Sequence, residues 1–263
     1  MKRILLFCLI GLTTLSCTLQ DHVTPTDTCK LAQYINYTGR NDFTYDGAGN
    51  VSNWLITRMF SNGKAYIINY DFTRDATGRI SSLNQTITND GNIEGTATAQ
   101  FTYTNGLLAS TSTTVDPANP GSISRTFSYD SNGRMSKRVV SDKTADFLST
   151  ETYEYDSRGN CTKYNYTDSD GLKNEQVFTY DTSKNPEQLL IKSIPFNLSL
   201  GLPWSVNVVL TTKETFDFGA GPEISTSKRT DIKTDARGYV TNATQTYDDG
   251  YVVKDTYSLI NCQ

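Results

Sequence analysis

A short phrase returns several times along this chain. It reads as two aromatic residues separated by one position, then Asp, two variable residues, Gly, Arg or Asn, and an apolar residue. Clear copies lie at 43–51, 127–135 and 153–161, looser copies at 72–80 and 232–240, and partial copies begin at Phe101 and Phe178. Neighbouring copies lie 25 to 29 residues apart, except that Asp181 and Asp235 are 54 residues apart, which is close to two periods. Because internal repeats set the architecture of a chain, the fold must be an array of one small unit.

Each copy predicts two antiparallel strands joined by a tight turn. Aromatic and polar side chains alternate through Tyr153-Glu154-Tyr155, which is typical of a strand with one apolar face. Asp156 can accept hydrogen bonds from the following turn and Gly159 can adopt a positive φ, so this segment predicts a hairpin loop with a bulge. Alternation resumes over 160–166. The same turn is expected at Asp46 and Gly49, Asp75 and Gly78, Asp130 and Gly133, and Asp235 and Gly238.

A calcium loop is the second interpretation of the Asp-Gly segments. An EF-hand loop needs oxygen ligands at alternate positions and a Glu further on. The segment Asp168-Ser169-Asp170-Gly171 has Tyr166 at the preceding ligand position. Turn chemistry is therefore favoured, and we predict neither a metal site nor a cofactor.

The repeats predict a single all-β domain over 29–263, an antiparallel meander of about fourteen to sixteen strands. A flat sheet would leave two open edges and an exposed aromatic face, whereas closure into a barrel removes both. Polar residues such as Glu154 and Lys163 oppose the aromatic face, which favours a soluble barrel. An open curled sheet, a two-layer sheet and a membrane-spanning barrel stay open as alternatives. The apolar stretch near 194–209 breaks the period and predicts an insertion that either plugs the lumen or packs as a strand and loop against the core.

The first residues predict export. Met1-Lys2-Arg3 is basic and 4–12 is apolar but short, so 1–16 is interpreted as a signal peptide. Leu15-Ser16-Cys17 looks like the lipobox of bacterial lipoproteins, which implies acylation of Cys17 and stable anchoring through several acyl chains. Residues 17–28 would form a tether. The expected location is the bacterial outer membrane, on its periplasmic or its outer face, with an ordinary signal peptide or short anchor as the alternative.

Three further cysteines have distinct expected roles. Cys29 and Cys262 flank the repeat domain, and an exported compartment is oxidising, so we predict a disulfide between them. Such a bridge fits a barrel, in which the first and last strands are neighbours. Cys161 occupies the apolar position that Val51 and Met135 hold in other copies, which predicts a buried free thiol.

The Tyr-x-Tyr-Asp-x-x-Gly-Arg phrase resembles the YD repeat of Rhs-type proteins, which build large hollow β shells. The lipobox, the length, Asn185-Pro186 and Ile194-Pro195-Phe196 also resemble a family of secreted bacterial lipoproteins of unknown function with a porin-like β-barrel fold. The resemblance covers nearly all of the mature chain. It implies a fold and a compartment, and it assigns no catalytic residue.

The residues also narrow the range of functions. The only His is His22, in the tether, so no His of the domain can act as a base or metal ligand. Nucleophile-elbow, phosphate-loop and cysteine-pair metal motifs are absent. A formal net charge of −4 disfavours nucleic acid as a partner.

We therefore expect a lipid-anchored envelope protein with a non-catalytic role in binding a glycan or a protein partner. Trp54 and Trp204 are the candidate ligand-binding residues, since flat aromatic faces suit sugars. A purely structural or interaction scaffold is the main alternative. A glycan hydrolase is the other, because that chemistry needs only two carboxylates.

Overall fold

The computed structural model describes residues 28–262 apart from 37–38, 61–62, 116–120, 192, 196–204 and 220. The described residues form antiparallel strands and a short 3-10 helix, η2 (Pro186–Leu190). The strands are β1 (Lys30–Asn36), β2 (Gly39–Tyr45), β3 (Val51–Met59), β4 (Ala65–Arg74), β5 (Ile80–Asn89), β6 (Asn92–Thr104), β7 (Leu107–Thr114), β8 (Ile123–Tyr129), β9 (Met135–Asp142), β10 (Phe147–Tyr155), β11 (Cys161–Asp168), β12 (Lys173–Lys184), β13 (Asn207–Asp217), β14 (Pro222–Thr234), β15 (Val240–Tyr247) and β16 (Val252–Ile260).

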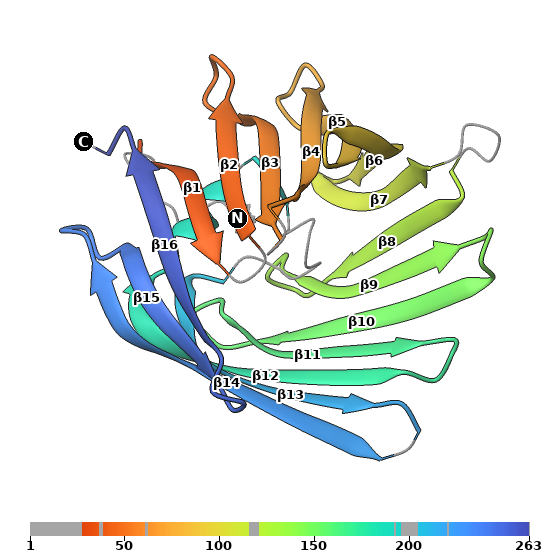
Figure 1. The fold of residues 1–263 in the computed structure, drawn as a ribbon. Coiled ribbons are helices and arrows are strands. Elements are labelled where there is room, and N and C mark those ends of the chain that lie inside the picture. The colour runs from red at the N-terminus through yellow and green to blue at the C-terminus, as the bar shows by residue number, and fades with distance from the viewer. Residues whose placement is uncertain are drawn as a thin grey trace, which may run out of the picture.

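The strands close into one barrel. Each strand pairs with its neighbours in chain order, and β1 pairs with β16 along the seam (Figure 1). The predicted closed meander is therefore confirmed, and sixteen strands stand at the upper end of the expected range. An open or two-layer sheet is excluded, because β1 and β16 hydrogen-bond to one another and leave no edge.

The two ends of the barrel carry different connections. Cys29, Cys262 and the repeat turns that join β2 to β3, β4 to β5, β8 to β9, β10 to β11 and β14 to β15 lie at one end, which we call the repeat-turn end. The connections from each odd-numbered strand to the next even-numbered strand lie at the opposite end, which we call the far end. Both described termini therefore lie at the repeat-turn end.

The repeat turns have the geometry that their residues favour. Gly159 has a φ of 90°, and the Asp156 carboxylate accepts hydrogen bonds from the N–H groups of Arg158 and Asn160 at 2.8 and 2.9 Å. Gly49, Gly78, Gly133 and Gly238 also have positive φ, and Asp46, Asp75, Asp130 and Asp235 accept turn N–H groups in the same way. A bulge follows the turn: Glu154 pairs with Lys163 and Tyr155 pairs with Cys161, so Thr162 is the extra residue. These contacts explain why Asp and Gly recur at this spacing.

In several phrases the second aromatic position couples one repeat to the previous one. Tyr155 donates its hydroxyl to the Met135 carbonyl oxygen at 2.6 Å, and Tyr129 donates to the Leu108 carbonyl oxygen at 2.9 Å. Where Arg74 replaces the tyrosine, its guanidinium donates to the Val51 carbonyl oxygen at 2.7 Å. In each case the acceptor belongs to the apolar residue that closes the preceding phrase. The motif is therefore a device for joining neighbouring hairpins as well as a turn.

The apolar faces of the strands point into the barrel and form two clusters. One cluster surrounds Trp54, Leu31 and Leu190, and the other surrounds Tyr153, Cys161 and Phe127. Tyr153 and Cys161 thus share one buried face. The outward positions of the same strands carry polar residues such as Glu154.

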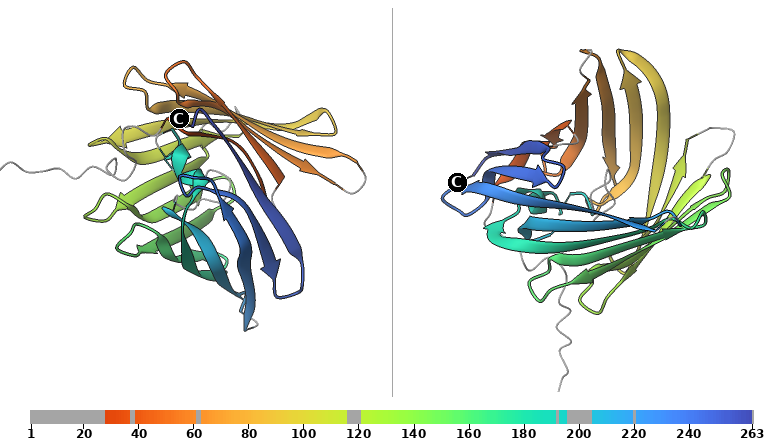
Figure 2. Two further views of the ribbon diagram at one scale, coloured as in Figure 1. Left: turned by 90° about the vertical axis from the view of Figure 1, so that its left-hand side faces the viewer. Right: turned by 60° about the horizontal axis from the view of Figure 1, so that its bottom comes forward.

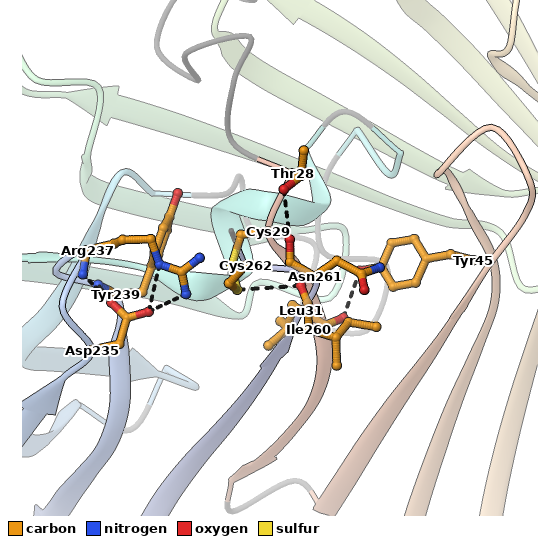
Figure 3. The surroundings of a disulfide bond; sticks show 10 residues. All are labelled: Thr28, Cys29, Leu31, Tyr45, Asp235, Arg237, Tyr239, Ile260, Asn261 and Cys262. Atoms are coloured by element: carbon orange, nitrogen blue, oxygen red, sulfur yellow. Dashed lines mark hydrogen bonds and ion pairs between the residues drawn. A yellow bond between two sulfur atoms is a disulfide. The ribbon is translucent and has the colours of Figure 1, made fainter.

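The seam between the first and last strands is held by a disulfide. Cys29 and Cys262 are bonded, with Cα atoms 4.2 Å apart and a sequence separation of 233 (Figure 3). Beside them the Thr28 hydroxyl donates to the Asn261 carbonyl oxygen at 2.8 Å. Cys161 is a buried free cysteine, and burial raises the pKa of its thiol to about 12. It therefore stays protonated and unreactive near neutral pH.

Candidate binding site in the barrel lumen

The chain between β12 and β13 enters the barrel at the repeat-turn end. It begins with Asn185, whose side chain accepts the Glu187 N–H at 3.1 Å and so starts η2. Leu190 and Ile194 are fully buried and pack in the cluster that contains Trp54. Figure 2 shows η2 inside the ring of strands. The interval between the two strands, 185–206, starts earlier than the insertion predicted near 194–209, and 207–209 belongs to β13. Residues 192 and 196–204 of this interval lie outside the described residues.

Hydrogen bonds tie this segment to strands on both sides of the lumen. The Ser193 hydroxyl accepts the Val51 N–H at 3.1 Å, and the Ser193 carbonyl oxygen accepts from Arg74 at 3.1 Å. The Ser205 hydroxyl accepts the Cys161 N–H at 3.3 Å. Because these contacts reach β3, β4 and β11, the described residues 185–191, 193–195 and 205–206 line the repeat-turn end of the lumen, and we call them the floor segment.

A cavity of about 220 Å³ lies against this floor. Its lining combines aromatic rings with hydrogen-bonding groups from β12 to β16 and from η2. The lining residues that matter below are Phe178, Tyr180, Glu187, Glu214, Arg229 and Tyr257. A cavity with this mixture of ring faces and polar groups is typical of a binding site for a small polar ligand.

Arg229 organises the polar side of the cavity. Its guanidinium donates to Asp255 at 2.6 Å, to Gln245 Oε1 at 2.9 Å and to the Val209 carbonyl oxygen at 3.0 Å. Asp255 is fully buried, so the ion pair offsets the cost of removing both charges from water. The group is thereby fixed in one orientation, which makes it a rigid wall of the site.

Glu187 is the most unusual ionisable residue of the cavity. Burial raises the pKa of its carboxyl from 4.5 to about 7, nearby Arg229 lowers it, Asp255 raises it, and a hydrogen bond from Tyr257 lowers it. That hydrogen bond is long, at 3.5 Å. Near neutral pH the carboxyl is therefore present in both its protonated and its ionised form. It faces the cavity. It can donate or accept a hydrogen bond to a ligand.

Glu214 contributes a second carboxylate to the lining. It accepts from the side chains of Asn174 at 2.8 Å and Gln176 at 2.5 Å, which hold it in place on β13. Together Glu187 and Glu214 give the cavity two acidic groups with different surroundings.

The structure corrects the interpretation of Trp54 as a ligand-binding residue. Its ring is fully buried, lies between Phe43 and Tyr70 with centroids 5.5 and 5.4 Å away, and donates its N–H to Asn41 at 3.0 Å. Its faces are covered by the core, because the inward side of β3 packs under the floor segment. Trp204 and Cys17 lie outside the described residues.

Sequence reasoning missed Glu187, Arg229 and Asp255. A signal was available for two of them, because Arg229 and Asp255 stand at positions that alternate in step with inward residues such as Tyr257. An ionisable residue on an otherwise inward face indicates a buried pair or a site. Glu187 carries no such signal, since it lies in the segment that breaks the repeat.

Metal sites and membrane helices are not found among the described residues. These residues contain no group of three or more His, Cys, Asp or Glu side chains suited to a metal ion. In the same part of the chain, no helix has the length and apolar character needed to cross a bilayer.

The chain matches no family model and no curated protein by sequence. It does match solved structures. The crystal structure of a porin-like protein from Bacteroides uniformis aligns over 87% of this chain and 97% of that chain, with 12% identity and a TM-score of 0.56. The shared property is the barrel. A porin-like protein from Bacteroides vulgatus aligns over 87% of this chain and 98% of that chain, with 11% identity, but its TM-score of 0.39 supports no argument.

The porin-like barrel that the resemblance implies is thus found at the level of the fold. Membership of the YD-repeat proteins and lipidation of Cys17 stay predictions.

Proposed function

We propose that this chain is a lipid-anchored protein of the bacterial outer membrane that binds a glycan, without catalysis, in the lumen of its barrel. The observation that carries the proposal is the cavity above the floor segment, which presents aromatic rings beside carboxylate, guanidinium and amide groups. Sugars have both apolar ring faces and many hydroxyls, so they need such a mixture. The proposed ligand therefore contacts the residues that line this cavity and not Trp54.

The residues on the outer surface favour a barrel whose wall faces water and not lipid. A membrane-spanning barrel needs an outward apolar band about 25 Å tall. Among the described residues, the exposed large apolar side chains lie around the far end, apart from Val177 and Ile260. Outward positions along the strands carry residues such as Thr211, Lys213 and Lys228. A bilayer would have to desolvate these charges.

The position of the floor segment suggests that the barrel is closed at its repeat-turn end and open at its far end, like a cup. Cys29 lies at the repeat-turn end, and twelve residues after Cys17 can reach at most roughly 40 Å. A chain acylated at Cys17 would hold the repeat-turn end toward the membrane and the far end away from it. Ligands would then enter through the far end.

A glycan array on the soluble chain lacking residues 1–17 tests the proposal. The informative variant is Ser225→Trp, which places a large ring in the cavity, and the matched control is Lys228→Trp, which places the same ring outside on the same strand. We expect the wild type and the Lys228→Trp variant to retain the same glycan and the Ser225→Trp variant to lose it. Retention by all three would exclude the lumen as the site, and no retained glycan at all would favour the scaffold alternative.

A glycan hydrolase is the second candidate, and Glu187 favours it. A carboxyl with a pKa of about 7 is suited to donate a proton to a leaving group, and Glu214 offers a second carboxylate on the same cavity. Release of reducing ends from the retained glycan, abolished by Glu187→Gln, would establish this function and overturn the non-catalytic one.

A further inference from the structure

The sector of the lumen formed by β7 to β10 lies away from the cavity described above. It contains a guanidinium that forms no ion pair with a carboxylate of the described residues. Arg125 on β8 shares the inward face of that strand with buried Phe127. It donates to the Thr113 hydroxyl at 2.9 Å and forms no ion pair with any described residue. A guanidinium carries five N–H donors, so most of its hydrogen-bonding capacity stays available. The Glu151 carboxylate lies within electrostatic reach and compensates this charge in part. A part-buried guanidinium without a directly paired carboxylate is still costly unless an anion or water faces it.

The neighbouring arginine is already neutralised. Arg138 on β9 makes a two-pronged pair with Glu151 on β10, with N···O distances of 2.8 and 2.6 Å. Arg138 pairs in register with Phe127 on β8, and Arg125 lies two residues before Phe127. Arg125 is therefore a diagonal neighbour of Arg138 on the same face. The Glu151 carboxylate is therefore fully engaged by Arg138 and is not left for Arg125.

Two further residues, one in this sector and one on β3, have buried polar atoms without a hydrogen-bond partner among the described residues. Thr111, the register partner of Arg125, is 4% exposed, and its hydroxyl has no hydrogen-bond partner among the described residues. Arg58 on β3 has a buried Nε that also lacks one. Burial raises the pKa of Tyr70, whereas Arg58 and Arg125 each act to lower it, so both guanidinium groups lie within electrostatic reach of that ring. Arg138 and Arg125 thus lie within electrostatic reach of the Glu151 carboxylate, and Arg58 and Arg125 lie within electrostatic reach of Tyr70.

We propose that Arg125, with Arg138, Arg58 and the Thr111 hydroxyl beside it, forms a binding site for an oxyanion, a carboxylate or sulfate group, in the lumen. The guanidinium fork matches two oxygens of such a group, and the threonine hydroxyl supplies one more donor.

The site goes beyond the proposed glycan cavity, which lies in the sector of β12 to β16 and carries Glu187 and Glu214. Tyr164 on β11 lies between the two, within electrostatic reach of both Glu151 and Glu214. The lumen is therefore basic on one side and acidic on the other. A ligand with one acidic group would be oriented by this separation, with that group toward β8. The anion could be a uronate or sulfate substituent of a glycan or a free inorganic ion.

The test is isothermal titration of the soluble chain with sodium sulfate, sodium glucuronate and methyl glucoside at constant ionic strength. The variants are Arg125→Gln and Arg125→Lys, and the matched control is Arg40→Gln, an exposed arginine on β2. Removal of an unpaired charge should not unfold the barrel, and circular dichroism and the thermal midpoint check this directly. The Lys variant keeps the charge but loses the fork.

We expect the wild type and Arg40→Gln to bind at least one of the two anions, Arg125→Gln to bind it more than tenfold more weakly, and Arg125→Lys to fall between them. Tighter binding of glucuronate than of sulfate would identify a sugar acid as the source, and equal binding would identify the free oxyanion. Equal affinities of wild type and Arg125→Gln, or no anion binding by the wild type, would overturn the inference. Retention of a neutral glycan in those cases would leave the proposed function standing, so the two failures are distinguishable.

Discussion

Replacing Glu187 by Gln should remove much of the change in stability between about pH 4.5 and 7. The folded pKa of this carboxyl is raised from 4.5 to about 7 by burial first of all. Below about pH 4.5 both the folded and unfolded states hold the proton, so the folded state has its full stability. As the pH rises, the unfolded chain releases the proton before the folded chain does. The free energy of unfolding therefore falls by about 3 kcal/mol across this window, and the neutral amide of the Glu187→Gln variant abolishes that loss.

Urea unfolding at pH 4, 5, 6, 7 and 8, followed by circular dichroism, measures the effect. We expect the wild type to lose about 3 kcal/mol more than the Glu187→Gln variant as the pH rises through the window. Glu154→Gln on the outer face of β10 is the matched control and should behave as the wild type does. Parallel stability curves for wild type and Glu187→Gln would refute the reasoning, because they would mean that the carboxyl ionises alike in both states.

Three further predictions concern the seam, the turns and the anchor. Replacing Cys29 and Cys262 by Ser should lower the free energy of unfolding by roughly 5 kcal/mol, from the entropy of closing so long a loop; equal unfolding of oxidised and reduced wild type would contradict it. Gly39→Ala should destabilise by more than Gly91→Ala, because both have positive φ but a Cβ at Gly39 would stand 2.4 Å from a carbonyl oxygen of β3, while Gly91 has open space; the comparison of thermal midpoints checks this. Cys17→Ala should release the protein from membranes or block its processing, and unchanged fractionation and cleavage would count against lipidation.

Local features of the chain were predictable because they depend on near neighbours. The turn at Asp156 and Gly159 needs only a carboxylate, two N–H groups and a positive φ within five residues. The inward side of each hairpin followed from the alternation of aromatic and polar residues, as at Tyr153 and Cys161. Closure followed from the number of strands and from the absence of any other cover for the aromatic face. The sequence by itself therefore determined the unit and the side of each strand that faces inward, and it favoured the barrel over an open or two-layer sheet.

The tertiary structure alone decided what meets inside the barrel. Arg229 and Asp255 lie on β14 and β16, which are not adjacent, so their contact depends on the curvature of the sheet and not on the register of one hairpin. The place of Glu187 depends on how a segment outside the repeat enters the lumen, and periodicity contains no information about such a segment. Trp54 shows the same limit. An inward tryptophan can contact a ligand if the lumen is open, but it is a core residue if other side chains fill the lumen, as they do here. Alternation fixes which side of a strand faces inward, but only the closed, filled barrel fixes what that side contacts.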